Sequence, residues 1–277
     1  MGMKTPYVSE IAPSTYAINE FGLSTMFLLE GTERAMLIDA GCGICDLEKV
    51  IRELTDKEYI VVLSHGHGDH IGAMGSFAQV YLNEQDWEMA KTIDWDVLRG
   101  FAEQSGKIGS YTIYDYSPEN IKPAEKMPEF LPLNDGDTFD LGDRVIEAIS
   151  IPGHTPGGMS FLDRKNRIMF SGDCCNINLG AMSASVETTL RSLRKFQSYA
   201  EHFDQNFNSH VGYFGRTDCL SQPKSVPDDL IQICEMVLNG TAQPQMIERG
   251  GKTVACVRYG HAKLSYLPDW LWDDVKE

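Results

Sequence analysis

The sequence predicts an α/β fold in which two β-sheets pack face to face and helices cover their outer sides. Strand-like apolar runs alternate along the 277 residues with amphipathic segments of helical spacing. Two of these runs, 35–39 and 167–173, each leave a charged turn and end on an aspartate, which indicates a weak internal duplication. Two such halves facing each other would bury a sheet-on-sheet core. An apolar content of 42% suffices for one large core or for two closely packed halves.

Turn residues and helix caps divide the chain into its elements. The predicted hairpins are 25–38 with a turn at 30–33, 139–151 with a turn at 142–143, and 159–170 with a turn at 163–166. The predicted single strands are 59–63, 79–82 and a C-terminal strand at 253–258, which follows a turn at 248–252. The predicted helices are 47–54 capped by Asp46, a short helix at 71–77, an apolar face from Val186 to Phe203 capped by Ser185, and a segment from Pro227 to Gly240.

Five of the seven histidines lie where a two-metal site would need them. The segment Ser64-His65-Gly66-His67-Gly68-Asp69-His70 directly follows the apolar strand at 59–63. His65 and His67, one residue apart on an extended loop, can bind one ion together, and the adjacent Asp69-His70 pair points toward a second. Imidazole nitrogens with carboxylate oxygens suit zinc or a similar borderline cation.

Three further candidate ligands lie at the ends of predicted strands. They are His154 in a Gly- and Pro-rich loop, Asp173 after an apolar strand, and His210 after a short strand-like run. Open sheets commonly build their sites where strands stop and loops begin. The shared position of these residues therefore favours one common site.

In their order along the chain, these residues resemble the five sequence motifs of the metallo-β-lactamase superfamily. The motifs are Asp39 in Leu37-Ile38-Asp39-Ala40-Gly41, the cluster of His65, His67, Asp69 and His70, then His154, Asp173 and His210. The resemblance extends from about residue 15 to the C-terminal strand, so it covers nearly the whole chain.

The resemblance implies a four-layer αββα sandwich formed as a single domain over 1–277, and it implies two divalent metal ions. It assigns His65, His67 and His154 to the first ion, Asp69, His70 and His210 to the second, and Asp173 to both as a bridge. Asp39 would orient the site without binding a metal. Zinc suits these ligands, although iron and manganese occupy related sites.

Two cations about 3.5 to 4 Å apart can share a water and hold it as hydroxide near neutral pH. That hydroxide would attack a carbonyl or phosphoryl centre, while a metal stabilises the oxyanion that forms. Asp69 is the candidate catalytic residue, expected to orient the nucleophile and to take up its proton. Glyoxalase-II-like thioesterases and lactonases share the bridging aspartate. The sequence thus predicts a metal-dependent hydrolase of a small ester, lactone or thioester.

Other functions of the same fold stay open. A phosphodiesterase is the main alternative. A β-lactamase is less favoured, because such enzymes usually carry a secretion signal and lack an aspartate at the bridging position. A non-catalytic metal-binding protein is less favoured because the set of seven ligands is intact.

The charge and the cysteines restrict partners and compartment. Acidic residues outnumber basic ones by 40 to 24, for a formal net charge of −16, and no basic block appears. Nucleic acid binding needs clustered Lys and Arg, so a small-molecule substrate is expected and a nucleic acid is not. No apolar run is long enough to cross a membrane, and the N-terminus lacks a secretion signal. Seven scattered cysteines are expected to be reduced thiols of a cytoplasmic protein.

The stretch from about 86 to 130 is too long for an ordinary connection. It contains the aromatic residues Trp87, Trp95, Phe101, Tyr111, Tyr114 and Tyr116 among acidic residues and prolines. One interpretation is a lid-like insertion whose aromatic side chains form a wall of the substrate pocket. The other is a satellite core or an interface in a homodimer, and a partner's lid could also complete the pocket.

Overall fold

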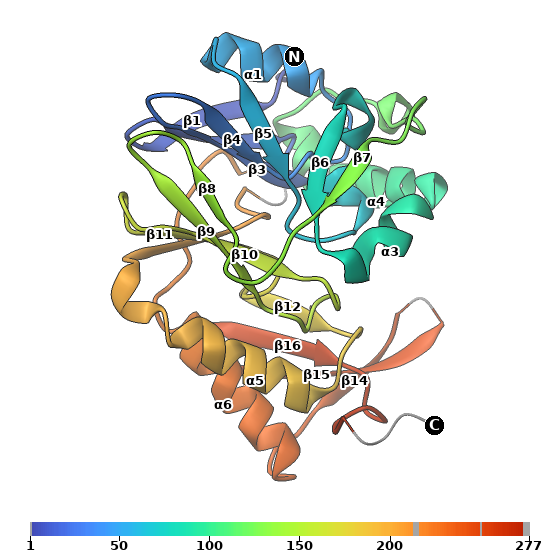
Figure 1. The fold of residues 1–277 in the computed structure, drawn as a ribbon. Coiled ribbons are helices and arrows are strands. Elements are labelled where there is room, and N and C mark those ends of the chain that lie inside the picture. Colours follow the sequence, from blue (N-terminus) through green and yellow to red (C-terminus); the bar gives the residue numbers. More distant parts are fainter. Residues whose placement is uncertain (1, 213–215, 250, 274–277) are drawn as a thin grey trace.

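Two β-sheets face each other at the centre of the structure, which is a computed structural model describing residues 2–212, 216–249 and 251–273 (Figure 1). The first sheet runs in the order β1 Tyr7–Ala12, β2 Thr15–Glu20, β3 Ser24–Glu30, β4 Ala35–Ile38, β5 Tyr59–Val62, β6 Gln79–Leu82 and β7 Glu129–Pro132. The second runs in the order β13 Gln205–Asn208, β11 Ile168–Gly172, β10 Met159–Asp163, β9 Val145–Ser150 and β8 Thr138–Asp140. The three predicted hairpins are confirmed as the antiparallel pairs β3–β4, β8–β9 and β10–β11.

The central strands are buried on both faces, because alternate residues contact different cores. On β3, Phe27 points into the core between the two sheets, whereas Leu28 points to the outer side of the first sheet. On β11, Phe170 points into the central core and Met169 to the outer side of the second sheet. The rings of Phe27 and Phe170 lie 4.8 Å apart between centroids, so the two sheets pack through aromatic contacts.

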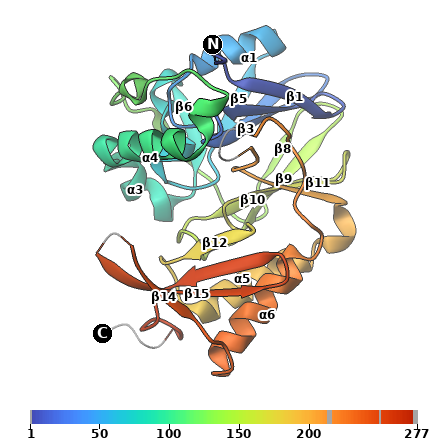
Figure 2. The ribbon, with the colours of Figure 1, turned by 180° about the vertical axis from the view of Figure 1, so that it is seen from behind.

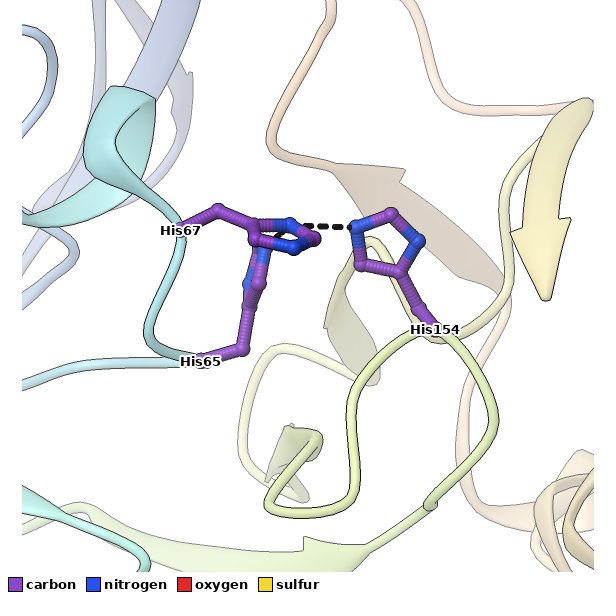
Figure 3. A group of neighbouring side chains, drawn as sticks. All are labelled: His65, His67 and His154. Atoms are coloured by element: carbon purple, nitrogen blue, oxygen red, sulfur yellow. Dashed lines mark hydrogen bonds between the residues drawn. The ribbon is translucent and has the colours of Figure 1, made fainter. Parts of the chain in front are cut away.

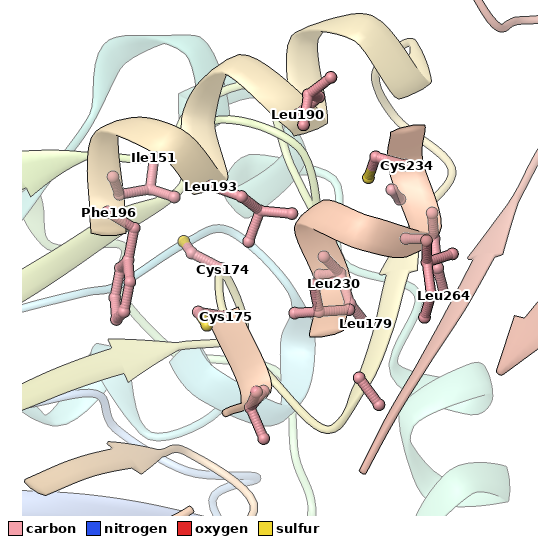
Figure 4. Packing of buried hydrophobic residues seen from close by; sticks show 14 of the residues in the cluster. Ile151, Cys174, Cys175, Leu179, Leu190, Leu193, Phe196, Leu230, Cys234 and Leu264 are labelled. Atoms are coloured by element: carbon pink, nitrogen blue, oxygen red, sulfur yellow. The ribbon is translucent and has the colours of Figure 1, made fainter. Parts of the chain in front are cut away.

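Helices cover both outer sides, as the sequence predicts. The helix α1, Leu47–Leu54, packs on the first sheet, and Asp46 caps it by accepting a hydrogen bond from Lys49 N at 3.1 Å. The helices α5, Val186–Gln197, and α6, Val226–Leu238, lie beyond the second sheet and pack on each other (Figure 4). The αββα layers are therefore confirmed. Among the described residues, no helix is long and apolar enough to cross a bilayer.

A third sheet was not expected from the sequence. It has the order β12 Asn178–Ala181, β16 Ala262–Tyr266, β15 Lys252–Tyr259 and β14 Gln245–Arg249, and it packs against α6 (Figure 2). The predicted strand at 253–258 is its strand β15. Four residues of β12 are too few to show a strand pattern, and all five residues of β14 are exposed, so neither strand has an apolar alternation. Gly250, within the predicted turn, lies outside the described residues.

The stretch from 86 to 130 is mostly helical, with α3 at Trp87–Lys91 and α4 at Trp95–Ile108. Its residues Leu98 and Tyr114 pack with Phe21 in a small core beside the first sheet. The end of this stretch then joins the sheet as β7, parallel to β6. The satellite core predicted as one interpretation is thus present, and roles in substrate binding or in a dimer stay predictions.

Two predicted helices differ from the observed ones. Over 71–77 the chain forms the short helix α2, Gly68–Ile71, and a 3-10 turn at Met74–Ser76. The N–H groups of Gly72 and Ala73 instead bond the carbonyls of Gly41 and Ala40, so this backbone is tied to the neighbouring loop. The helix α5 ends at Gln197, and only a 3-10 turn at Ala200–His202 follows it before Phe203.

Candidate metal centre

The seven predicted ligands come from four loops, each of which follows a strand. The strands and the residues that follow them are β5 before His65, His67, Asp69 and His70, β9 before His154, β11 before Asp173 and β13 before His210, with Asp39 directly after β4 in a fifth loop. These loops meet at one end of the sandwich. The structure therefore brings together all seven side chains that the sequence singled out, and it leaves His202 and His261 elsewhere on the surface.

Three imidazoles form the first group of the site (Figure 3). His67 Nδ1 lies 3.1 Å from His65 Nε2 and 2.9 Å from His154 Nε2. The three rings stand nearly perpendicular to one another in pairs, so their nitrogens converge on one point. This group could hold one cation.

Asp69, His70 and His210 form the second group, and Asp173 lies between the two groups. One oxygen of Asp69 is 3.6 Å from the Nε2 atoms of both His70 and His210. The Oδ2 atom of Asp173 is 3.0 Å from His210 Nε2, 3.8 Å from His70 Nε2 and 3.5 Å from His154 Nε2. A single carboxylate oxygen thus reaches nitrogens of both groups.

The ring nitrogens that face away from the centre are held by hydrogen bonds. His154 Nδ1 lies 2.7 Å from Gly180 O and His210 Nδ1 lies 2.9 Å from Leu23 O. A carbonyl can only accept, so both rings carry their proton on Nδ1 and present Nε2 to the centre. His70 Nδ1 likewise lies 3.1 Å from Asp39 Oδ2. Such outer contacts fix the orientation of metal-binding imidazoles.

Asp39 organises this outer layer. Its Oδ1 accepts from Ser64 N at 2.7 Å, and its Oδ2 accepts from the hydroxyls of Ser64 and Ser209 at 2.9 and 2.7 Å. Ser64 Oγ also lies 3.0 Å from His65 Nδ1, so Asp39 acts on both histidine groups. The sequence pointed to Asp39 through the family resemblance, but not to Ser64 or Ser209. The only available signal for these serines was that each directly precedes a ligand candidate, His65 or His210.

Two histidines of the first group, His65 and His67, are held neutral. Burial, together with the neighbouring imidazoles, holds the pKa of His65 well below its ordinary value. Burial and His154 lower the pKa of His67 to about 4. Neutral imidazoles present free lone pairs, which is the state that binds a metal.

The second group is more polar. Burial disfavours a charge on His70, but the carboxylates of Asp69, Asp39 and Asp173 outweigh it and raise its pKa to about 10. Burial likewise opposes ionisation of Asp173. The neighbouring His210, and to a lesser extent His70, nevertheless hold the pKa of Asp173 well below its usual range. Without a metal, these acids and histidines stabilise one another as an ion-pair network.

The residues present fit a divalent cation. His70 Nε2 is buried without a hydrogen-bond partner, although carboxylate oxygens lie 3.6 and 3.8 Å away, too far for a hydrogen bond. A cation between these atoms would satisfy the nitrogen. Tetrahedral coordination at about 2.0 Å places ligand nitrogens roughly 3.3 Å apart, close to the spacing of the three-histidine group.

One side of the site is open. His65 and His70 are almost fully buried, whereas the side chains of Asp69 and His154 keep 20% and 15% of their surface exposed. His67 is also partly exposed. Solvent therefore reaches the centre past Asp69, His67 and His154.

Comparison with known families gives the identity of the fold and of the motifs. Residues 19–175 match the family described as the metallo-beta-lactamase superfamily. The match covers more than half of the chain and includes Asp39, the histidine cluster, His154 and Asp173. The chain belongs to this superfamily.

Several relatives are named as thioesterases, and two of them show the extent of the match. A human protein, acyl-coenzyme A thioesterase MBLAC2, is 25% identical over 163 residues, which cover 54% of this chain and 57% of that protein. Atrochrysone carboxyl ACP thioesterase dmxR1 of Cryptosporiopsis sp. (strain 8999) is 28% identical over 185 residues, 64% of this chain and 46% of that protein. The chain thus spans about half the length of these relatives.

Solved structures share the fold. The metallo-beta-lactamase family protein TTHA1429 from Thermus thermophilus matches with a TM-score of 0.57 and 20% identity, over 85% of each chain. The sec-alkylsulfatase Pisa1 from Pseudomonas sp. matches with a TM-score of 0.60 and 14% identity, over 85% of this chain and 42% of that one.

Proposed function

We propose that this protein is a metal-dependent hydrolase that cleaves a small acyl thioester or a related ester or lactone. The observation that carries the proposal is the convergence of seven ligand side chains in adjoining groups, with Nε2 of His70 buried there without a hydrogen-bond partner. The thioester preference within this proposal is supported by the relatives, several of which are named as thioesterases.

The assignment of ligands follows the two groups. His65, His67 and His154 would hold one divalent ion, Asp69, His70 and His210 a second, and Asp173 both. The bound ions would supply an activated water and an electrophile that polarises the substrate carbonyl. Zinc is the proposed metal because nitrogen ligands dominate the site, and iron or manganese would suit the same ligands.

The remaining chemistry belongs to side chains of this chain. His70 and His210 lower the pKa of Asp69 despite its burial, so this carboxylate is ionised at neutral pH. It lies at the open side, where it can orient the attacking water and accept its proton at Oδ1, the oxygen that does not face His70 and His210. His65 and His67, whose pKa values are lowered, present fixed neutral nitrogens and need not titrate during the reaction.

The electrostatics support a small substrate rather than a polyanion, since the net charge is −16. All seven cysteines are unpaired, which supports a reducing compartment such as the cytoplasm. The short helix α2, which carries Asp69, lies against α4, where a Cβ on Gly68 would come within 3.3 Å of Leu98. We therefore include the 86–130 stretch as one wall of the substrate site.

The test combines elemental analysis with a substrate panel. Protein purified without added metal is analysed for zinc, iron and manganese, then reconstituted with each ion. It is assayed on an acyl-coenzyme A thioester, a lactone, a p-nitrophenyl ester and bis-p-nitrophenyl phosphate. The proposal expects metal-dependent turnover of an acyl substrate. Turnover of the phosphodiester alone would make the protein a phosphodiesterase, and tight metal binding with no turnover would favour a non-catalytic role.

Exposed apolar residues on α4 allow the two interpretations of the 86–130 stretch to be separated. Val97 and Ile108 are 67% and 59% exposed. Val97→Asp and Ile108→Asp should raise KM if the segment binds substrate. If the variants instead sedimented as monomers where the wild type is a dimer, without a change in KM, this face would be assigned to a homodimer interface.

A further inference from the structure

Asp86 is a fully buried carboxylate that contacts two of the loops that carry the histidines. Its Oδ2 accepts hydrogen bonds from Gly66 N at 2.9 Å and from Thr155 Oγ1 at 2.7 Å. Its Oδ1 accepts from Gly157 N at 2.8 Å. Gly66 lies between His65 and His67, and Thr155 directly follows His154.

The two loops come from different halves of the molecule. The loop around Gly66 follows β5 of the first sheet, whereas the loop from 153 to 158 joins β9 to β10 of the second. Asp86 itself ends a 3-10 turn, Glu84–Asp86, directly before α3. One side chain therefore holds the backbones of both halves at a fixed separation, next to the three-histidine group.

The glycines of both loops make this approach possible. A Cβ on Gly157 would lie 2.7 Å from Asp86 Cγ, and a Cβ on Gly66 would lie 2.9 Å from the Asp86 carbonyl oxygen. Real side chains do not tolerate such contacts. Both loops therefore lack a Cβ at the points where Asp86 fits between them.

We propose that Asp86 is a positioning residue that sets the distance between His154 and the His65–His67 pair, and with it the affinity of the first ion. This inference rests on the proposed metal centre. His67 Nδ1 and His154 Nε2 belong to the two loops that Asp86 joins and lie 2.9 Å apart. In the second group, none of Asp69, His70 and His210 is next in sequence to a residue that Asp86 contacts. The affinity of this group for its ion should therefore not depend on Asp86.

An amide cannot replace this carboxylate. Two of the three donors are backbone N–H groups, one facing each oxygen of Asp86, and neither can turn away. In Asp86→Asn, the amide nitrogen must face one of them whichever way the side chain is placed, so one contact is lost. Losses of this kind around metal ligands typically weaken metal affinity by about 10- to 100-fold.

The experiment measures Zn²⁺ affinity by calorimetric titration in two backgrounds that separate the ions. His210→Ala retains the three-histidine group, and His67→Ala retains the other group. Asp86→Asn should weaken Zn²⁺ binding by about 10- to 100-fold in the first background and leave it unchanged in the second. A general loss of folding would lower both affinities together, so their ratio distinguishes positioning from stability.

Thr155 gives a second, milder test in case Asp86→Asn does not fold. Thr155→Val removes one hydrogen bond to Asp86 while keeping the shape of the side chain. It should lower the affinity for the first ion by about tenfold or less. Thr155→Ser keeps the hydroxyl and should retain the affinity. Asp229→Asn is the matched control, because this buried carboxylate on α6 accepts from Ser225 Oγ and from His261 N in the turn between β15 and β16, and in the described part of the chain it contacts no loop that carries a ligand candidate.

Three results would overturn the inference. These are unchanged first-ion affinity in both Asp86→Asn and Thr155→Val, an equal loss at both ions, or an equal loss in Asp229→Asn. A wild-type protein that binds no Zn²⁺ would instead overturn the metal centre itself, and the role of Asp86 with it.

Discussion

Asp39 Oδ2 lies 3.1 Å from His70 Nδ1, and this contact directs the opposite nitrogen of His70 to the centre of the site. Asp39 has a backbone φ of 66°, in the left-handed region that Asn and Asp tolerate better than most residues. This conformation lets the residue after β4 turn its carboxylate back toward the neighbouring loops. The left-handed backbone conformation of Asp39 thus places its carboxylate where it can hold His70.

Asp39→Asn is the substitution that tests this contact, since asparagine also tolerates the left-handed conformation. The amide loses at least one of the acceptor positions that serve Ser64, Ser209 and His70. We expect metal affinity to fall by about 10- to 100-fold. The free energy of unfolding of the metal-free protein should fall by about 1 to 3 kcal/mol. Chelator competition and urea unfolding measure the two effects. Unchanged affinity in a destabilised variant would limit Asp39 to a structural role.

Removing ligands should change the metal content in steps. His67→Ala removes a central nitrogen of the first group and should reduce the bound metal from the proposed two ions to one. Asp173→Ala should weaken both ions, because Oδ2 lies near nitrogens of both groups. Elemental analysis after gel filtration measures the content. His202→Ala, at an exposed position, should change nothing, and full occupancy in His67→Ala would contradict the ligand assignment.

The stability of the metal-free protein should decline on both sides of about pH 6.5. His70 has a pKa raised to about 10, so the folded state keeps a proton that the unfolded chain releases. Its contribution is complete below the unfolded value of about 6.5 and is lost as the pH rises toward 10. The pKa of His67 is lowered to about 4, chiefly by burial, so the unfolded chain is protonated first as the pH falls from about 6.5.

Urea unfolding at pH values from about 4 to 10, with and without Zn²⁺, measures the decline in stability on the acidic and on the alkaline side. Zn²⁺ at the second group must displace the proton of His70, so its affinity should rise with pH by about tenfold per unit through pH 7 to 9. His70→Gln should remove the alkaline decline of the metal-free protein. If the stability of that variant still declined equally at alkaline pH, another group would be the cause.

Asp69→Asn should reduce turnover of the acyl substrate by about 10²- to 10⁴-fold if the carboxylate accepts the proton of the attacking water. KM should change less, because binding of the acyl chain does not depend on this proton. Steady-state kinetics on metal-saturated protein separate the two constants. A proportional loss of activity and metal content would show that Asp69 acts only as a ligand.

Local patterns in the sequence were enough to predict the α/β layers and to point to the side chains that the structure brings together. Apolar runs such as β3, where Phe27 and Leu28 face opposite sides, and caps such as Asp46 and Ser185 are local signals, so their elements could be predicted. The spacing of His65, His67, Asp69 and His70 is also local, and it pointed to metal chemistry before any fold was known.

Features that depend on contacts between distant segments could not be predicted and became visible only in the folded chain. The third sheet pairs β12 with β16, some 80 residues later in the chain, and neither the exposed β14 nor the short β12 has a local pattern of its own. The helix expected at 71–77 gave way because Gly72 and Ala73 bond the loop after β4. Ser209 and Asp86 likewise gain their roles only when loops from the two sheets meet, since hydrogen bonds between distant segments leave no periodicity in the sequence.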